Sequence, residues 1–196
     1  MPENDPLRVA VIVGSIRTDR FGPIPARWIA ERARQHGSFE VDVIDLAEAD
    51  LPFVLGGDDP GAPVPPQVAA LSPRLAQADA FIVVTPVYNR GYPASLKNAI
   101  DWFYTEWNAK AVGFVSYGGL TGGVTSVEAL RAVFNEVQAT TIRNTVCFMD
   151  CHDKFDEEGN PVTPEPVNVA AKAFLEQLEW WARALRDARR VSPYVV

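Results

Sequence analysis

Val9-Ala-Val-Ile-Val-Gly-Ser-Ile-Arg17 is the stretch of this sequence that decides its fold. An unbroken run of apolar, mostly β-branched residues is typical of a strand that is buried on both faces of a sheet. The run ends at Gly14-Ser15, and an arginine follows two residues later. In open α/β sheets, ligands bind at the carboxyl ends of the strands. The glycine turn, the hydroxyl, the free backbone N–H groups and the guanidinium therefore predict a phosphate site.

Strands and helices are predicted to alternate along the rest of the chain. The strands are expected at 7–14, 39–45, 80–85, 111–117 and 141–149. The helices are expected at 24–36, 67–78, 94–107, 123–138 and 167–189. Strict alternation predicts a parallel sheet with helices on both faces, a three-layer α/β sandwich. Five strands favour the flavodoxin-like order 2-1-3-4-5, with 39–45 at or near an edge and the topological switch between strands 1 and 3.

Length and charge narrow the class of protein. The 196 residues predict a single domain, 1–196, with its core at about 7–150 and a C-terminal loop and helix at 151–196. A formal charge of −7 argues against a nucleic-acid-binding surface. No apolar run is long enough to predict a membrane span. The polar start Met-Pro-Glu-Asn-Asp-Pro is unlike a secretory signal, which indicates the cytoplasm.

Cysteine and histidine are too sparse to predict metal or triad chemistry. Cys147 and Cys151 are expected to be reduced thiols, because disulfides are rare in the cytosol. They form neither a CxxC pair nor a four-ligand zinc set. With only His36 and His152 available, no metal cluster and no Ser-His-Asp arrangement is expected.

The loop after the first strand, 14–23, carries two arginines close to the start of a helix. The simpler interpretation is a turn that only needs its glycine. However, Arg17 and Arg20 oppose the positive end of the helix dipole unless an anion is present, which favours a phosphate. The loop matches neither the dinucleotide GxGxxG motif nor the Walker GxxxxGK[ST] motif.

The loop after the third strand, 86–92, offers groups that suit a heteroaromatic ring. Tyr88 and Tyr92 have flat apolar faces with a polar tip, and Asn89 has amide donors and an acceptor. The alternative is a turn that exposes two tyrosines. Because this loop and 14–23 follow the strands at the topological switch, they should flank one ligand.

The loop after the fourth strand, 116–123, has four glycines within six residues. Glycines allow a backbone to approach a ligand closely, although a flexible connection would use them too. All three loops are expected at the same edge of the sheet.

These motifs together resemble the NADPH-dependent FMN reductases, a family that includes quinone, azo-dye and chromate reductases. The resemblance covers about 7–150. It rests on Gly-Ser-x-Arg after the first strand, on Pro-x-Tyr-Asn and the following Leu96-Lys-Asn-Ala-Ile-Asp-Trp102, and on Gly-Gly after the fourth strand.

The resemblance implies an enzyme with FMN as cofactor, and it implies which residues hold it. FMN would pass hydride by a ping-pong mechanism from NADPH or NADH to a quinone, a flavin, an azo compound or a similar small acceptor, with no catalytic side chain. A homodimer or homotetramer is implied, with helix 94–107 and Trp102 near the partner subunit. The implied phosphate-binding residues are Ser15, Arg17, Phe21 and Gly22, with Arg20 beside them. The implied neighbours of the isoalloxazine ring are Pro86, Tyr88, Asn89 and Arg90, with Ser116, Gly118 and Gly119 on its pyrimidine side.

Two other functions remain open on the same fold. One is a flavodoxin-type electron carrier, which holds FMN without activity on pyridine nucleotides. The other is a flavin-free regulatory or scaffold protein, because fold alone does not fix function. The sequence also departs from the family at Val87, where Glu or Gln is common.

Overall fold

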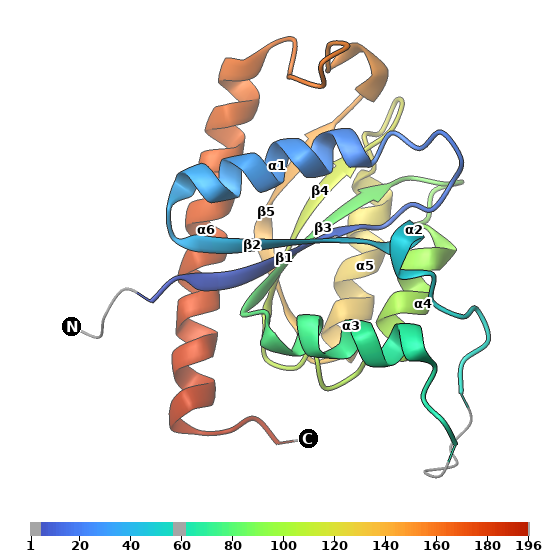
Figure 1. Ribbon diagram of the computed structural model, residues 1–196. Helices are drawn as coiled ribbons and strands as arrows, with labels where there is room; N and C mark the ends of the chain where they lie inside the picture. Colours follow the sequence, from blue (N-terminus) through green and yellow to red (C-terminus); the bar gives the residue numbers. More distant parts are fainter. Residues whose placement is uncertain (1–4, 57–61, 196) are drawn as a thin grey trace.

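In the computed structural model, which describes residues 5–56 and 62–195, five parallel strands form one sheet between two layers of helices (Figure 1). The strands are β1 (Leu7–Val13), β2 (Phe39–Asp45), β3 (Ala80–Pro86), β4 (Ala111–Tyr117) and β5 (Thr140–Phe148). Their order is β2-β1-β3-β4-β5, which confirms the predicted flavodoxin-like order and places β2 at an edge. Two expectations fall partly outside the described residues. The expected absence of a secretory signal concerns the start of the chain, which includes 1–4, and the loop expected at 50–66 includes 57–61.

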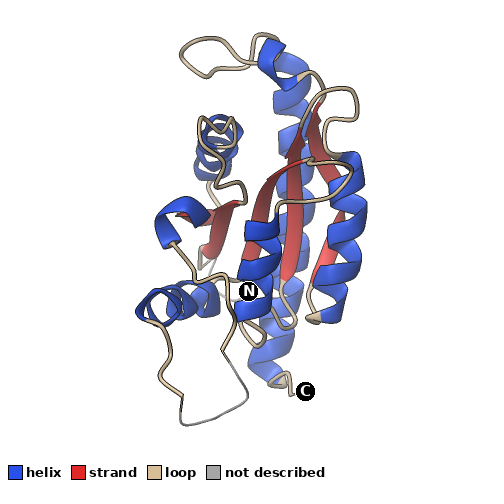
Figure 2. Ribbon diagram, turned by 90° about the vertical axis from the view of Figure 1, so that its right-hand side faces the viewer, coloured by secondary structure: helices blue, strands red, loops and turns tan. Residues whose placement is uncertain are grey.

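Helices cover both faces of the sheet, as Figure 2 shows. One face carries α1 (Pro23–His36) and α6 (Pro164–Val191), and the other carries α3 (Pro66–Gln77), α4 (Ala94–Trp102) and α5 (Val124–Glu136). A one-turn 3-10 helix, η1 (Cys151–Asp153), follows β5. No helix in the described part of the chain has the length and apolarity that crossing a membrane requires.

A short helix that was not predicted, α2 (Leu46–Ala49), follows β2 directly. It begins after Asp45, whose side chain accepts the N–H of Ala47 at 3.0 Å. Aspartate is a preferred N-cap residue because its carboxylate satisfies one of the free N–H groups of the first turn. The apolar pattern of β2 continues into this turn without a break, so the sequence pattern does not show where the strand ends and the helix begins.

The predicted helix 94–107 is too long. α4 ends at Trp102 because Phe103 adopts an extended conformation, with φ −124° and ψ 134°. Phe103 and Trp107 are nevertheless buried, and the Trp107 indole N–H donates to the carbonyl of Ile100 at 3.2 Å. Their helical spacing therefore reflects burial in the same core and not a continuous helix.

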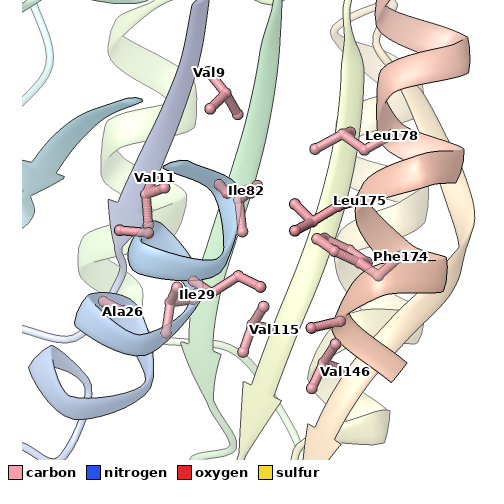
Figure 3. Close-up of a cluster of buried hydrophobic side chains, with 14 of the residues drawn as sticks. Val9, Val11, Ala26, Ile29, Ile82, Val115, Val146, Phe174, Leu175 and Leu178 are labelled. Atoms are coloured by element: carbon pink, nitrogen blue, oxygen red, sulfur yellow. The ribbon is translucent and has the colours of Figure 1, made fainter. Parts of the chain in front are cut away.

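The hydrophobic core between the sheet, α1 and α6 follows the predicted apolar runs (Figure 3). Val11 and Ile82 from the central strands meet Ile29 from α1, and all three are fully buried. On the same face of the sheet, Phe174 of α6 lies against Gly113 of β4, where a Cβ atom would come within 2.5 Å of the ring. Gly113 therefore leaves the space that the aromatic ring fills.

Lys110 is a buried cation at the amino-terminal edge of the sheet, just before β4. Its ammonium group donates to the carbonyls of Leu75 and Ala76, at 2.8 Å each, at the end of α3. The negative end of a helix dipole favours such a cation. Burial, together with the nearby charge of Arg189, lowers the pKa of Lys110 to about 8.

We expect the stability of the protein to depend on this lysine above neutral pH. The folded-state pKa of Lys110 lies below the value of 10.5 for a free lysine, so the unfolded chain binds the proton more tightly. Between pH 8 and 10.5 the free energy of unfolding should therefore rise with pH relative to that of Lys110→Met. Urea denaturation of both proteins over this range measures the difference. Parallel pH curves would contradict the expectation.

Candidate functional site

The carboxyl ends of β1, β3 and β4 meet around a cavity of about 460 Å³. Of the twelve site residues predicted from the sequence, the structure brings seven together in its wall: Arg17, Arg20, Phe21, Pro86, Tyr88, Gly118 and Gly119. The other five, Ser15, Gly22, Asn89, Arg90 and Ser116, lie in the same three loops or at the strand ends beside them but do not line the cavity.

Ser15 and Tyr88 join the loops after β1 and β3. Their hydroxyl oxygens lie 2.6 Å apart in a hydrogen bond. Ser15 is fully buried, and its oxygen also accepts the backbone N–H of Arg17 at 3.4 Å. Ser15 thus holds the first turn of the loop in place, and Tyr88 presents its side chain to the cavity.

The loop after β1 presents a set of free hydrogen-bond donors. In the described part of the chain, no hydrogen bond or ion pair engages the exposed Arg17 guanidinium, and no acceptor takes up the backbone N–H groups of 18–21. Gly22 permits this course of the chain, because a Cβ atom there would lie 2.7 Å from the Tyr117 hydroxyl. Clustered backbone N–H groups and an arginine before a helix are the donors that a phosphate requires.

Arg20 differs from Arg17 because its charge already has a partner. Its guanidinium forms an ion pair with Asp45 at the end of β2, and the two side chains are only 22% and 15% exposed. The Arg20 Nε is buried without a partner among the described residues. Asp45 therefore fixes Arg20 in the cavity wall, while its other oxygen caps α2.

Removing the Asp45 carboxylate should destabilise the fold through both contacts. We expect Asp45→Ala to lower the free energy of unfolding by about 1–3 kcal/mol, because the cap and the partner of a half-buried arginine are lost together. Asp45→Asn should cost less, since asparagine also caps helices. Urea denaturation measures both.

Asp42 provides the matched control on the same strand. Its ion pair with Arg74 is about half exposed, so Asp42→Ala should cost at most about 1 kcal/mol. Equal losses for the alanine variants of Asp42 and Asp45 would contradict the role assigned to Asp45.

A tight turn at Tyr88–Gly91 forms the rim of the site. The N–H and carbonyl groups of Tyr88 and Gly91 bond each other at 2.8 and 2.9 Å, and the Ser126 hydroxyl donates to the Gly91 carbonyl at 2.8 Å. Asn89 and Arg90 both have positive φ, 49° and 70°, with exposed side chains. Successive left-handed residues are unusual for non-glycine residues and persist where the surroundings impose them. No partner within the described chain takes up their N–H groups.

The glycines after β4 bring the third loop close to the second. A Cβ atom on Gly118 would lie 2.7 Å from Cγ1 of Val87, so these two loops are in close contact at the cavity wall. The chain after β5 braces the loop from behind, because the N–H of Cys151 donates to the Gly118 carbonyl at 3.0 Å. Ser116 lies beneath the loop, fully buried, and its hydroxyl has no partner among the described residues.

Six lining residues were not among those predicted: Thr18, Asp19, Val87, Tyr117, Cys151 and His152. Tyr117 could have been found, since it is the last residue of a predicted strand at the expected edge. The rings of Tyr117 and His152 both pack against the ring of Phe21. The centroid of the Phe21 ring lies 5.5 Å from that of Tyr117 and 5.1 Å from that of His152. Cys151 and His152 reach the cavity through the fold of the chain after β5, which no local motif indicates.

The tyrosine and the thiol in the wall are uncharged at neutral pH. Burial raises the pKa of the Tyr117 hydroxyl, and the neighbouring Tyr88 adds to this effect. Burial also raises the pKa of Cys151, which is a free thiol, as is Cys147. Among the charged side chains in the wall, Arg17 is therefore the cation left for an anionic ligand, because Arg20 is paired.

The sequence profile of the NADPH-dependent FMN reductases matches residues 7–153. An NAD(P)H-dependent FMN reductase of Schizosaccharomyces pombe is 40% identical over 123 residues, which is 59% of this chain and 60% of that protein. The chain thus aligns with less than two thirds of this relative's length. A 2-hydroxy-1,4-benzoquinone reductase of Burkholderia sp. is 29% identical over 92% of this chain and 98% of that protein.

A solved structure shows the same architecture over most of the chain. It is the flavoenzyme NAD(P)H:(acceptor) oxidoreductase FerB of Paracoccus denitrificans, with a TM-score of 0.72 and 27% identity. The superposition covers 89% of this chain and 98% of that one. The profile and the fold thus agree on the region that contains the three loops.

Proposed function

The chain belongs to the NADPH-dependent FMN reductase family, and on this premise we propose that it transfers hydride from NAD(P)H through FMN to a small acceptor by a ping-pong mechanism. Quinones, flavins and azo compounds are the proposed acceptors. The observation that carries the proposal is the single cavity at which the loops after β1, β3 and β4 meet.

The phosphate of FMN is proposed to bind at the loop after β1. The free N–H groups at 18–21 and the unpaired Arg17 guanidinium supply the donors, and Gly22 allows the chain to pass close to Tyr117. Arg20 adds a buried Nε donor from a side chain that Asp45 holds still. Ser15 and Phe21 complete this end of the site, Ser15 by fixing the turn and Phe21 as part of the wall.

The isoalloxazine ring is proposed to lie between the loops after β3 and β4. The supporting features are the free N–H groups of Asn89 and Arg90 and the close approach of the two loops at Gly118. The proposed neighbours of the ring are Pro86, Tyr88, Asn89, Arg90, Ser116, Gly118 and Gly119. FMN, when bound, would supply the hydride chemistry, so the protein has to position ligands and complement their charge. A wall with uncharged Tyr117 and Cys151 suits that role.

The proposal also covers the location of the protein, its domain content and its assembly. We place the chain in the cytoplasm, where two free cysteines remain reduced. It would act as one FMN-binding domain that assembles into a homodimer or homotetramer.

A spectrum and a turnover assay test the proposed function. The purified protein, alone or after addition of FMN, should show the absorption bands of bound flavin. It should then oxidise NADPH with menadione as acceptor and no second protein, and double-reciprocal rate plots should be parallel. A protein that binds no FMN contradicts the proposal, and a flavoprotein without NADPH turnover identifies an electron carrier instead.

A further inference from the structure

The turn at Tyr88–Gly91 carries backbone strain at its second central residue. Tyr88 and Gly91 pair as an antiparallel bridge, so Asn89 and Arg90 form a two-residue hairpin loop, with φ of 49° and 70°. Such loops strongly favour Asn-Gly, because asparagine tolerates positive φ and glycine adopts it without steric cost. Here the first position holds the preferred asparagine, whereas the second holds an arginine. The loop therefore needs support from its surroundings to keep this conformation.

Two side-chain hydrogen bonds from outside the turn supply this support. At one end, the Tyr88 hydroxyl pairs with the hydroxyl of Ser15 at 2.6 Å. At the other end, the Ser126 hydroxyl of α5 donates to the carbonyl of Gly91 at 2.8 Å. Ser126 is fully buried and lies outside the wall of the cavity. Any influence of Ser126 on a ligand in the cavity therefore passes through the turn.

The start of α5 is a rigid base for the Ser126 contact. A Cβ atom on Gly123, the N-cap residue of α5, would lie 2.8 Å from Cβ of Ser116 and 3.1 Å from the backbone nitrogen of Tyr117. Glycine at this position thus lets the helix begin directly against the end of β4. Because β4 is an inner strand of the sheet, Ser126, the third residue of α5, is fixed relative to the sheet.

We propose that Ser126 is a positioning residue for the flavin ring. Its hydrogen bond keeps the Asn89-Arg90 loop in the strained form, in which the two N–H groups of the loop have no partner within the described chain. These donors are then available to the polar edge of the ring. Donors that are already ordered bind a ligand more tightly than donors that have to be ordered on binding. The proposal rests on the proposed function, because it explains how neighbours of the ring are held.

Removing the Ser126 hydroxyl tests this role. We expect Ser126→Ala to weaken the binding of FMN and of riboflavin by the same factor, about two- to tenfold, which is the range of one hydrogen bond. The factors should be equal because the loop acts on the ring, which both ligands share. Fluorescence quenching on titration gives both dissociation constants.

Ser72→Ala is the matched control. It removes the hydrogen bond that a serine hydroxyl of α3 donates to Glu106 at 2.6 Å, at the amino-terminal edge of the sheet. Both flavin affinities should stay at their wild-type values in this variant, because the lost contact lies at the opposite edge from the cavity.

Arg90→Gly separates an effect on the strained loop from general support of the fold. Because glycine adopts positive φ freely, a loop with Gly at this position should keep its shape without Ser126. Ser126→Ala should therefore weaken flavin binding less than twofold when it is added to Arg90→Gly. The same factor in both backgrounds would show that Ser126 does not act on the strained loop.

Hydrogen exchange tests the contact in the absence of flavin. The N–H groups of Tyr88 and Gly91 each bond the carbonyl of the other residue across the turn. In the flavin-free protein, Ser126→Ala should raise their exchange rates at least fivefold relative to Ser72→Ala, because the turn opens more readily.

The other outcomes overturn the assignment at different points. Unchanged exchange rates, or flavin affinities equal to those of Ser72→Ala, would show that Ser126 does not position the loop. A loss confined to FMN would place its effect at the phosphate. A wild-type protein that binds neither FMN nor riboflavin would overturn the proposed function and with it the role of Ser126 toward the ring, whereas the exchange rates decide separately whether Ser126 holds the turn.

Discussion

Replacing Phe174 by alanine is expected to lower the free energy of unfolding by about 3–5 kcal/mol. Phe174 of α6 is fully buried against the sheet (Figure 3). Its ring lies over Gly113 of β4. Because Gly113 has no side chain, nothing on β4 can move into the space that the ring leaves. The residual cavity adds to the lost transfer free energy, which makes this the largest expected effect on stability. Urea denaturation followed by circular dichroism measures it.

Gly113 provides the control, because its effect should depend on the ring above it. In the wild-type background, Gly113→Ala should destabilise by about 1–3 kcal/mol, since the added Cβ meets a closely packed ring. In the Phe174→Ala background the same change should cost less or even stabilise the protein. Additive effects of the two substitutions would show that Gly113 and Phe174 do not share this space.

Replacing Arg17 by alanine is expected to weaken FMN binding about ten- to a hundredfold, which corresponds to the 1.5–3 kcal/mol of a charge-assisted hydrogen bond. The guanidinium has no other partner in the described chain, so its whole charge is available to the proposed phosphate. Arg17→Lys should show an intermediate loss, because an ammonium group cannot make the paired contact of a guanidinium. Quenching of FMN fluorescence on titration gives the dissociation constants.

Riboflavin separates a phosphate contact from a general loss of the site. Because riboflavin lacks the phosphate, its affinity should be nearly equal in wild type and Arg17→Ala. Arg34→Ala removes the same charge at the far end of α1 and should leave FMN affinity unchanged. An equal loss for riboflavin and FMN, or no loss for either, would contradict the assignment of Arg17.

The sheet could be predicted from the sequence because its inner strands are fully buried. β1, β3 and β4 are runs of apolar residues with almost no exposed position, and such runs leave few alternatives. The end of α4 could not be predicted, because Phe103 and Trp107 keep helical spacing while the backbone turns away. Burial and helix periodicity give the same pattern over so short a segment.

The candidate site was predictable where a loop directly follows a buried strand. Gly14-Ser-Ile-Arg17 and the turn at Tyr88 belong to this group, and the predicted resemblance to the FMN reductases is confirmed by the family profile. The partner of Arg20 was not predictable, because Asp45 is separated from it by 25 positions and meets it only through the pairing of β1 with β2. Cys151 and His152 were missed for the same reason, since they reach the wall through contacts behind the loop after β4.

Arg17 and Tyr88 line two neighbouring cavities, the one at the ends of β1, β3 and β4 and the one beside α2 and α4, and so form a wall between them. Two ligands bound on its two sides would both contact these side chains, so each is expected to change the affinity of the other. Whatever factor one of them applies to the affinity of the other is returned in the opposite direction, as thermodynamic reciprocity demands. Titrating one cavity with and without a ligand in the other therefore measures the size and the sign of this coupling in the absence of turnover.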